Sequence, residues 1–206
     1  MKFKEFLLQE GLYDPGIFKA FFMAGGPGSG KSFIASNTFA GSGLKFVNSD
    51  QVFERGLKKA NLSDKMPDQE KYFRDIIRNS AKGTTKRQLD TYVTGRLGLV
   101  IDATGRDYDR INNEFRMLQA LGYDCYMVFV NTTLDVALER NKIRSRQIPE
   151  YIVKKSWEGV QSNIGKFQRL FGMRNFIVVD NNKSDLELTT LTMNRISKVV
   201  RKSRRF

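Results

Sequence analysis

The stretch AFFMAGGPGSGKS, residues 20–32, decides the fold, because it joins an apolar run to a glycine-rich loop. Residues 25–32 complete the pattern G-x-x-x-x-G-K-[ST], and a helix-like stretch begins near Lys31. The apolar run before the loop predicts a buried strand. Glycines let backbone N–H groups turn inward around phosphates, and Pro27 stiffens the turn. This strand–loop–helix order predicts a nucleoside triphosphate site.

The loop residues have separate predicted roles. Lys31 reaches the β- and γ-phosphate oxygens, and the Ser32 hydroxyl ligates Mg²⁺. The backbone that surrounds the phosphates is supplied by Gly25, Gly26, Pro27, Gly28, Ser29 and Gly30. The alternative is a glycine-rich turn with a solvated lysine, which the strand before the loop and the helix after it disfavour. We therefore expect ATP and Mg²⁺ as cofactors.

The composition limits the classes of protein. With 206 residues, 40% hydrophobic and 28% charged, the chain fits one compact α/β domain. It has neither a run of about 18 apolar residues nor the apolar core of a secretion signal, so we expect a soluble protein with no membrane partner. The single Cys125 excludes an internal disulfide and favours a reducing compartment. A net charge of +13 modestly favours polyanionic partners.

Four further apolar runs predict strands. They cover residues 45–48, 98–102, 126–130 and 176–180. The segments between them are long enough for crossover helices, which predicts a parallel sheet with helices on both faces and ligands at the carboxyl ends of the strands.

Helical periodicity occurs between and after these strands. It is clearest over residues 108–121, 134–144, 150–171 and 184–201. Residues 52–95 contain no strand pattern, and we expect two or three helices there that cap an acceptor site.

Asp50 directly follows the second predicted strand, on the same edge of the sheet as the loop. Phosphoryl transfer needs a group that takes the proton of the attacking hydroxyl, and a chain without histidine must use a carboxylate or, less readily, a lysine or tyrosine. Asp50 is therefore the candidate catalytic base. The alternative is that Asp50 only caps a helix that begins near Gln51.

Asp102 ends the third predicted strand, where P-loop enzymes place a carboxylate near Mg²⁺. We expect Asp102 to support the metal, with Thr104 near a metal-bound water or the acceptor. The alternative is an aspartate in a turn before Gly105.

Arginines cluster after the fourth predicted strand. Arg140 and Arg144 stand at i and i+4 on one predicted helix face, followed by Arg146. Guanidinium groups that close over the phosphoryl group stabilise its charge, so we expect a catalytic lid that ends at residues 147–149. The alternative is a solvated face on which Glu139 pairs with neighbouring cations.

These motifs resemble those of the P-loop kinase family that contains polynucleotide 5′-hydroxyl kinases and zeta-type toxins. The resemblance covers residues 20 to about 180. The matching elements, in order, are residues 25–32, Asp50, residues 100–104, Glu139 with Arg140, Arg144 and Pro149. The resemblance implies a P-loop kinase fold with sheet order 2-3-1-4-5 and a helical lid. It also implies that Asp50 activates an acceptor hydroxyl and that Arg140 and Arg144 form the lid.

The chain departs from this family at Phe53. Polynucleotide kinases usually carry an arginine there, three residues after the catalytic aspartate, to hold a substrate phosphate. Arg55, two residues further on, is the candidate substitute.

Residues 1–11 carry a second resemblance, to the leader of internal head proteins of large contractile-tailed phages. A prohead protease cuts such leaders after Leu-x-Glu, which Leu8-Gln9-Glu10 matches. The resemblance implies a cleavable leader at 1–10, a kinase domain at 11–206, and a protein of the host cytoplasm that is packed into the phage head. The alternative is an amphipathic helix with Phe3, Phe6 and Leu7 on one face.

The sequence thus predicts an ATP- and Mg²⁺-dependent kinase whose acceptor is a nucleic-acid 5′-hydroxyl or a nucleoside derivative. One alternative is a zeta-like kinase of a nucleotide sugar. Another is a catalytically inactive, basic phage protein that binds DNA. The basic C-terminal tail is predicted separately to be either a solvated cationic end or a contact for nucleic acid.

Overall fold

A computed structural model describes residues 17–63, 67–144, 147–182 and 186–202 of the chain. The predicted leader at residues 1–10 and Arg146 lie outside these ranges. Cleavage of the leader and packaging into a phage head therefore stay predictions from the sequence.

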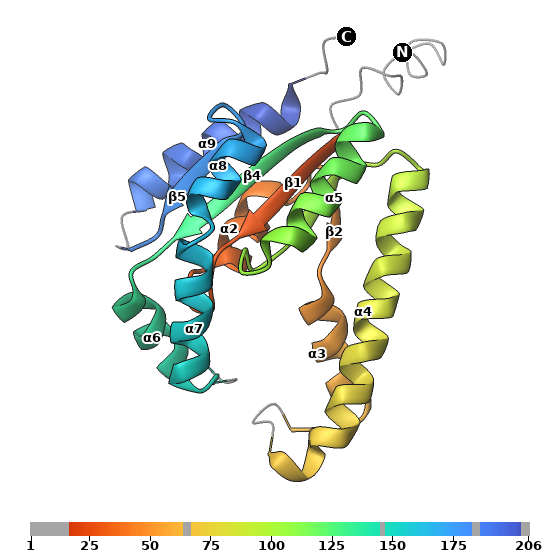
Figure 1. Cartoon of the computed structure of the whole chain (residues 1–206), viewed down its shortest axis with the longest axis vertical. Helices are drawn as coiled ribbons and strands as arrows, with labels where there is room; N and C mark the ends of the chain where they lie inside the picture. Colours follow the sequence, from red (N-terminus) through yellow and green to blue (C-terminus); the bar gives the residue numbers. More distant parts are fainter. Residues whose placement is uncertain (1–16, 64–66, 145–146, 183–185, 203–206) are drawn as a thin grey trace.

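Five strands form one sheet in the order β2-β3-β1-β4-β5, and every neighbouring pair is parallel (Figure 1). The strands are β1 (Lys19–Ala24), β2 (Lys45–Val47), β3 (Leu99–Asp102), β4 (Asp124–Asn131) and β5 (Phe176–Asp180). All five predicted strands are confirmed, with ends that differ by at most two residues. The strand order is the one that the family resemblance implied.

The sheet is buried on both faces, as its uninterrupted apolar strands require. All six residues of β1 are buried, and alternate side chains enter two separate cores. Phe22 packs edge-on against Phe171, in the core beneath α5 (Tyr108–Ala120) and α8 (Ile164–Phe171). Phe21 packs against Phe39 on the other face, which α2 (Lys31–Phe39) and α9 (Leu186–Arg201) cover.

The helix predicted over residues 150–171 is wrong in one respect, because the structure divides it into α7 (Glu150–Gln161) and α8. The side chain of Asn163 explains the break. Its Nδ2 donates hydrogen bonds to the carbonyl oxygens of Gly105 (3.2 Å) and Arg106 (2.9 Å), in the loop that follows β3. The break therefore fixes the start of α8 to the carboxyl end of the sheet.

The helices predicted over residues 52–95 are confirmed as α3 (Ser49–Lys59), a short 3-10 helix (Asp68–Glu70) and α4 (Lys71–Thr94), and their role as a cap over an acceptor site stays a prediction. Phe53 and Leu57 of α3 form a small core with Ala81 of α4. Figure 1 shows α3 and the first half of α4 side by side beyond the carboxyl end of β2, on the other side of the molecule from α6 (Leu134–Lys142) and α7. Within the described ranges, no helix is both long and apolar enough to cross a bilayer.

The end of α9 is fixed by Lys19, a buried residue that sequence reasoning did not single out. Its Nζ donates to the carbonyl oxygens of Val199 (3.0 Å), Val200 (2.7 Å) and Lys202. These carbonyls lie at the C-terminus of a helix, where the helix itself offers no donors. An ammonium group at the amino end of β1 thus secures α9 against the sheet.

Candidate active site

The phosphate-binding loop lies between β1 and α2 and adopts a conformation that needs glycine. Gly28 and Gly30 have φ values of 78° and 82°, which L side chains rarely adopt. A Cβ on Gly28 would come within 2.4 Å of the Ala137 carbonyl oxygen on α6, and one on Gly30 within 2.3 Å of Asn181 Nδ2. The loop is therefore enclosed by α6 on one side and by the end of β5 on another.

Side chains from these two elements also bind the carbonyl groups of the loop. Asn181 Nδ2 donates to the Ser29 carbonyl oxygen (2.7 Å), and Arg140 Nη1 donates to that of Gly28 (3.4 Å). The loop reaches a third element through the Gly25 N–H, which donates to the Thr104 carbonyl oxygen after β3 (3.0 Å). Arg140 therefore contacts the phosphate-binding loop, and its role in a lid stays a prediction.

One polar atom inside the loop stays unpaired. The Ser29 hydroxyl is buried and has no hydrogen-bond partner among the described residues. It lies against Gly25, where a Cβ would approach it to 2.6 Å. Buried polar groups are normally paired, so an orphaned hydroxyl in this loop fits the binding of a phosphate there.

Lys31 and Asp102 form an ion pair at the carboxyl edge of the sheet. Lys31 Nζ lies 2.9 Å from Asp102 Oδ1, and each side chain is 17% exposed. The other carboxylate oxygen, Oδ2, accepts a hydrogen bond from Asn48 Nδ2 (2.6 Å). Asp102 therefore connects the loop lysine to the residue that follows β2.

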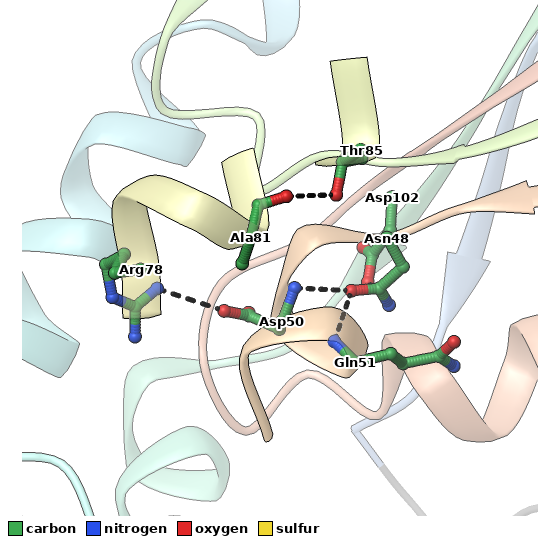
Figure 2. Close-up of polar contacts among 7 residues, drawn as sticks. All are labelled: Asn48, Asp50, Gln51, Arg78, Ala81, Thr85 and Asp102. Carbon is green, nitrogen blue, oxygen red and sulfur yellow. Dashed lines mark hydrogen bonds and ion pairs between the residues drawn. The ribbon is translucent and has the colours of Figure 1, made fainter. Parts of the chain in front are cut away.

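Asn48 is the N-cap of α3, which makes the alternative role for Asp50 wrong. Asn48 Oδ1 accepts from the backbone N–H groups of Asp50 (2.8 Å) and Gln51 (3.1 Å), as Figure 2 shows. A capping side chain comes from the residue before the first turn, and α3 already begins at Ser49. The Asp50 carboxylate is therefore not used as a cap.

The Asp50 carboxylate instead faces α4. Arg78 Nη1 lies 3.3 Å from Asp50 Oδ1, and the Arg78 guanidinium stacks 3.8 Å above the ring of Phe53. Figure 2 shows Asp50 between Arg78 and Asn48. A continuous chain of contacts thus leads from the loop to the cap helices; its members are Lys31, Asp102, Asn48, Asp50 and Arg78.

The predicted pairing of Arg140 with Arg144 on one helix face is not what the structure shows. Helix α6 ends at Lys142, and Arg144 is an exposed residue beyond it. The side chain of Asn141 accounts for the early end, because it bonds both to the N–H (3.0 Å) and to the carbonyl oxygen (2.6 Å) of Ile148 and folds the following loop back. Arg140 alone of the two contacts the phosphate-binding loop.

Two asparagines and one arginine of the site were missed by sequence reasoning. Asn48 and Asn181 directly follow β2 and β5, so the rule that singled out Asp50 and Asp102 applies to them as well. Arg78 comes from the middle of α4, 28 residues after its partner Asp50, and no spacing in the sequence predicts that contact.

The oxygen donors of the site fit Mg²⁺ that is bound together with a nucleotide. Ser32 stands exposed in the first turn of α2, and Asp102 ends β3. Across the described ranges, no group of three or more acidic, histidine or cysteine residues is placed to hold a metal. Mg²⁺ commonly takes one or two protein oxygens and completes its shell with phosphate and water, which this pair of donors matches.

Comparisons with known structures agree with this architecture. A gluconokinase from Sinorhizobium meliloti matches with TM-score 0.54 at 13% identity, over 90% of this chain and 95% of that one. The PezAT chromosomal toxin–antitoxin system of Streptococcus pneumoniae matches with TM-score 0.57 at 15% identity, over 88% and 87%. The Pnkp1/Rnl/Hen1 RNA repair complex matches with TM-score 0.58 at 16% identity, over 74% of this chain and 47% of that one. At these identities the likeness shows the fold alone.

Comparison by sequence gives one family. No curated protein matches the chain. The family model AAA_33, described as "AAA domain", matches residues 21–166, which is more than half of the chain and includes the loop, Asp50, Asp102 and Arg140. The chain is a member of this AAA domain family, with the fold of the P-loop kinases.

Proposed function

We propose that the protein transfers the γ-phosphoryl group of ATP to a hydroxyl group of an acceptor, with Mg²⁺ as cofactor. The observation that carries the proposal is the chain of contacts from Lys31 through Asp102 and Asn48 to the start of α3, which carries Asp50. It joins a triphosphate-binding loop to a carboxylate on a separate pair of helices. Phosphoryl transfer needs the donor and acceptor sites to lie next to each other, and these contacts hold the start of α3 beside the loop.

The donor side is built from the loop, Lys31 and Arg140. Backbone N–H groups of a loop of this type surround the phosphates, and the Lys31 ammonium exchanges the Asp102 carboxylate for phosphate oxygens. Ser32 and Asp102 would hold Mg²⁺, which when bound would neutralise part of the phosphate charge. Arg140, already on the loop, stabilises the charge of the transferring group.

Asp50 is the catalytic base on the acceptor side. Its carboxylate is 61% exposed, so an acceptor hydroxyl can reach it. The acceptor oxygen forms a bond to the γ-phosphorus, the bond from phosphorus to the β,γ-bridging oxygen breaks, and the hydroxyl proton passes to Asp50. ADP and a phosphorylated acceptor are the products.

A nucleic-acid 5′-hydroxyl or a nucleoside derivative is the acceptor that we favour. The net charge of +13 suits a polyanion, and the fold likeness extends to an RNA repair complex. A nucleotide sugar is the second candidate, because the motifs also resemble those of zeta-type toxins and the fold likeness extends to a chromosomal toxin–antitoxin system. An inactive DNA-binding protein is disfavoured, because the contacts between Lys31, Asp102 and Asn48 are intact.

The test is transfer of radiolabelled γ-phosphate to a panel of acceptors. The panel holds 5′-hydroxyl DNA, 5′-hydroxyl RNA, nucleosides and UDP-amino sugars. We expect one class to be labelled by the wild type and none by Asp50→Asn, which keeps the shape of the side chain but cannot accept the proton. Equal labelling by the Asp50→Asn variant, or binding of DNA without labelling of any acceptor, would overturn the proposal.

A further inference from the structure

We propose that Arg78 binds a phosphate of the acceptor next to the hydroxyl that Asp50 activates. The inference rests on the proposed function, because it takes Asp50 as the base. It narrows the acceptor to molecules that carry a phosphate close to the reacting hydroxyl. The terminal nucleotide of a polynucleotide and a free nucleoside 3′-phosphate share that chemistry.

The placement of Arg78 is the first reason. Its guanidinium lies within 3.3 Å of the Asp50 carboxylate, so whatever Asp50 contacts lies within reach of Arg78. One face of the guanidinium covers the ring of Phe53 at 3.8 Å. That ring is 1% exposed and packed between α3 and α4, so it is a fixed support. A guanidinium that is stacked on a ring still presents its N–H edge, which matches two oxygens of a phosphate.

The second reason is that the ion pair between Arg78 and Asp50 contributes little to the stability of the fold. The Arg78 and Asp50 side chains are 36% and 61% exposed, and ion pairs in water contribute little to folding. An exposed pair is, however, easily exchanged. An arriving acceptor can offer its phosphate to Arg78 and its hydroxyl to Asp50, which replaces one ion pair by two matched contacts.

Neighbouring cations are less well placed for this role. Arg55, the substitute that the sequence suggested, lies exposed on α3, and its Nε donates to the Gln51 carbonyl oxygen of its own helix (3.3 Å). Arg74, one turn before Arg78 on α4, donates to the Pro67 carbonyl oxygen. Arg78 is the arginine of this group that contacts Asp50.

The kinetic test compares Arg78→Gln, Arg78→Lys and the matched control Arg55→Gln in the full chain. We expect Arg78→Gln to raise KM for a nucleoside 3′-phosphate about tenfold or more, with KM for ATP unchanged. Arg78→Lys should recover part of the loss, because it keeps the charge without the planar fork. KM for the nucleoside without a phosphate should be the same in the wild type and in the variants. A uniform loss for both acceptors would show a structural role and overturn the inference.

A binding measurement separates failure of this inference from failure of the proposed function. Calorimetric titration with adenosine 3′-phosphate and with adenosine requires no turnover, so it decides the role of Arg78 even if no acceptor is labelled. We expect the phosphate to tighten binding to the wild type and to Arg55→Gln but not to Arg78→Gln. If adenosine 3′-phosphate binds the wild type no more tightly than adenosine, the inference is wrong.

A short 5′-hydroxyl oligonucleotide and a UDP-amino sugar complete the panel and distinguish the sources of the phosphate. Loss of oligonucleotide labelling in Arg78→Gln, parallel to the loss with adenosine 3′-phosphate, assigns the site to a polynucleotide end. A wild type that labels only the UDP-amino sugar, with a KM that Arg78→Gln leaves unchanged, contradicts the inference while upholding the proposed kinase. Thermal unfolding of each variant checks that the cap helices stay folded.

Discussion

Two lysines on opposite sides of β1, Lys19 at its start and Lys31 at the start of α2, have different kinds of partner. Lys19 begins the strand, is 2% exposed, and donates to carbonyl oxygens at the end of α9. Lys31 follows the carboxyl end of the strand and pairs with the Asp102 carboxylate. The described acceptors of Lys19 are carbonyl oxygens at the end of the chain's own last helix, whereas the partner of Lys31 lies where a phosphate can replace it. The amino end of the sheet thus serves stability, and the carboxyl end serves ligand binding.

The largest effect that we expect separates catalysis from folding at Lys31. Lys31→Met keeps the length of the side chain but removes the charge that follows the transferring phosphoryl group. We expect kcat to fall by a factor of about a hundred or more, by analogy with the loss of one preorganised donor. The melting temperature should fall only modestly, because the Asp102 carboxylate loses its ion-pair partner but keeps its hydrogen bond from Asn48. Phosphoryl transfer and thermal unfolding, measured on the same preparation, check the expected kcat and melting temperature. Turnover at the wild-type rate would refute the role of Lys31.

The converse is expected at Lys19. Lys19→Met fills the same space but leaves carbonyl groups at the end of α9 without a donor, which costs about 2–4 kcal/mol of the free energy of unfolding. Below the melting temperature, kcat should be unchanged. Urea unfolding and hydrogen exchange of α9 are the measurements.

Lys45→Met is the matched control for Lys19, because Lys45 also begins a strand but is exposed. Its effect on stability should stay within about 0.5 kcal/mol, as for other surface substitutions. Equal destabilisation by the two variants would show that the contacts of Lys19 with α9 are not the cause.

A smaller effect is expected at Asn48, which both stabilises the start of α3 and contacts the site residue Asp102. Asn48→Ala removes the cap of α3 and should cost about 1 kcal/mol of stability. It also removes the donor to Asp102, so turnover should fall as well. The serine hydroxyl of Asn48→Ser restores a capping oxygen, but it is too short to reach Asp102 and lacks the amide donor. We expect it to recover stability without recovering turnover; recovery of both would mean that the contact with Asp102 is dispensable.

The same contrast explains how much the sequence could predict. Lys31, Asp102 and the five strands were predictable, because a loop motif and apolar runs are local patterns with a known physical cause. Lys19 was not, because its partners lie about 180 residues away and a lysine before an apolar run gives no sign that it will be buried. Arg78 was missed for the same reason, since its contact with Asp50 depends on how α3 packs against α4.

The helix ends that were predicted wrongly have a common cause. Residues 134–144 and 150–171 continue a helical pattern, but Asn141 and Asn163 bond to other loops and end or divide the helices. An asparagine side chain that competes for the backbone changes a helix boundary only when its partner, in the next loop or a distant one, is in place. Periodicity describes the face of a helix and not this competition.

The smallest effect concerns Cys125, which lies on β4 beside Ala20, one residue along β1 from Lys19. Burial, with a lesser contribution from the charge of Asp124, raises the pKa of the Cys125 thiol from 9.0 to about 12. The unfolded chain therefore loses this proton above about pH 9 while the folded chain keeps it, so the free energy of unfolding falls as the pH rises from 9 toward 12. At pH 10 Cys125 lowers the free energy of unfolding by about 1 kcal/mol. Tyr123 acts in the same direction, since burial and then the charge of Cys125 raise its pKa to about 12.

Cys125→Ala should thus make the alkaline loss of stability shallower than in the wild type, measured by urea unfolding between pH 7 and pH 10. An unchanged slope would mean that this end of the sheet is less shielded from water than the burial of Lys19 and Cys125 indicates.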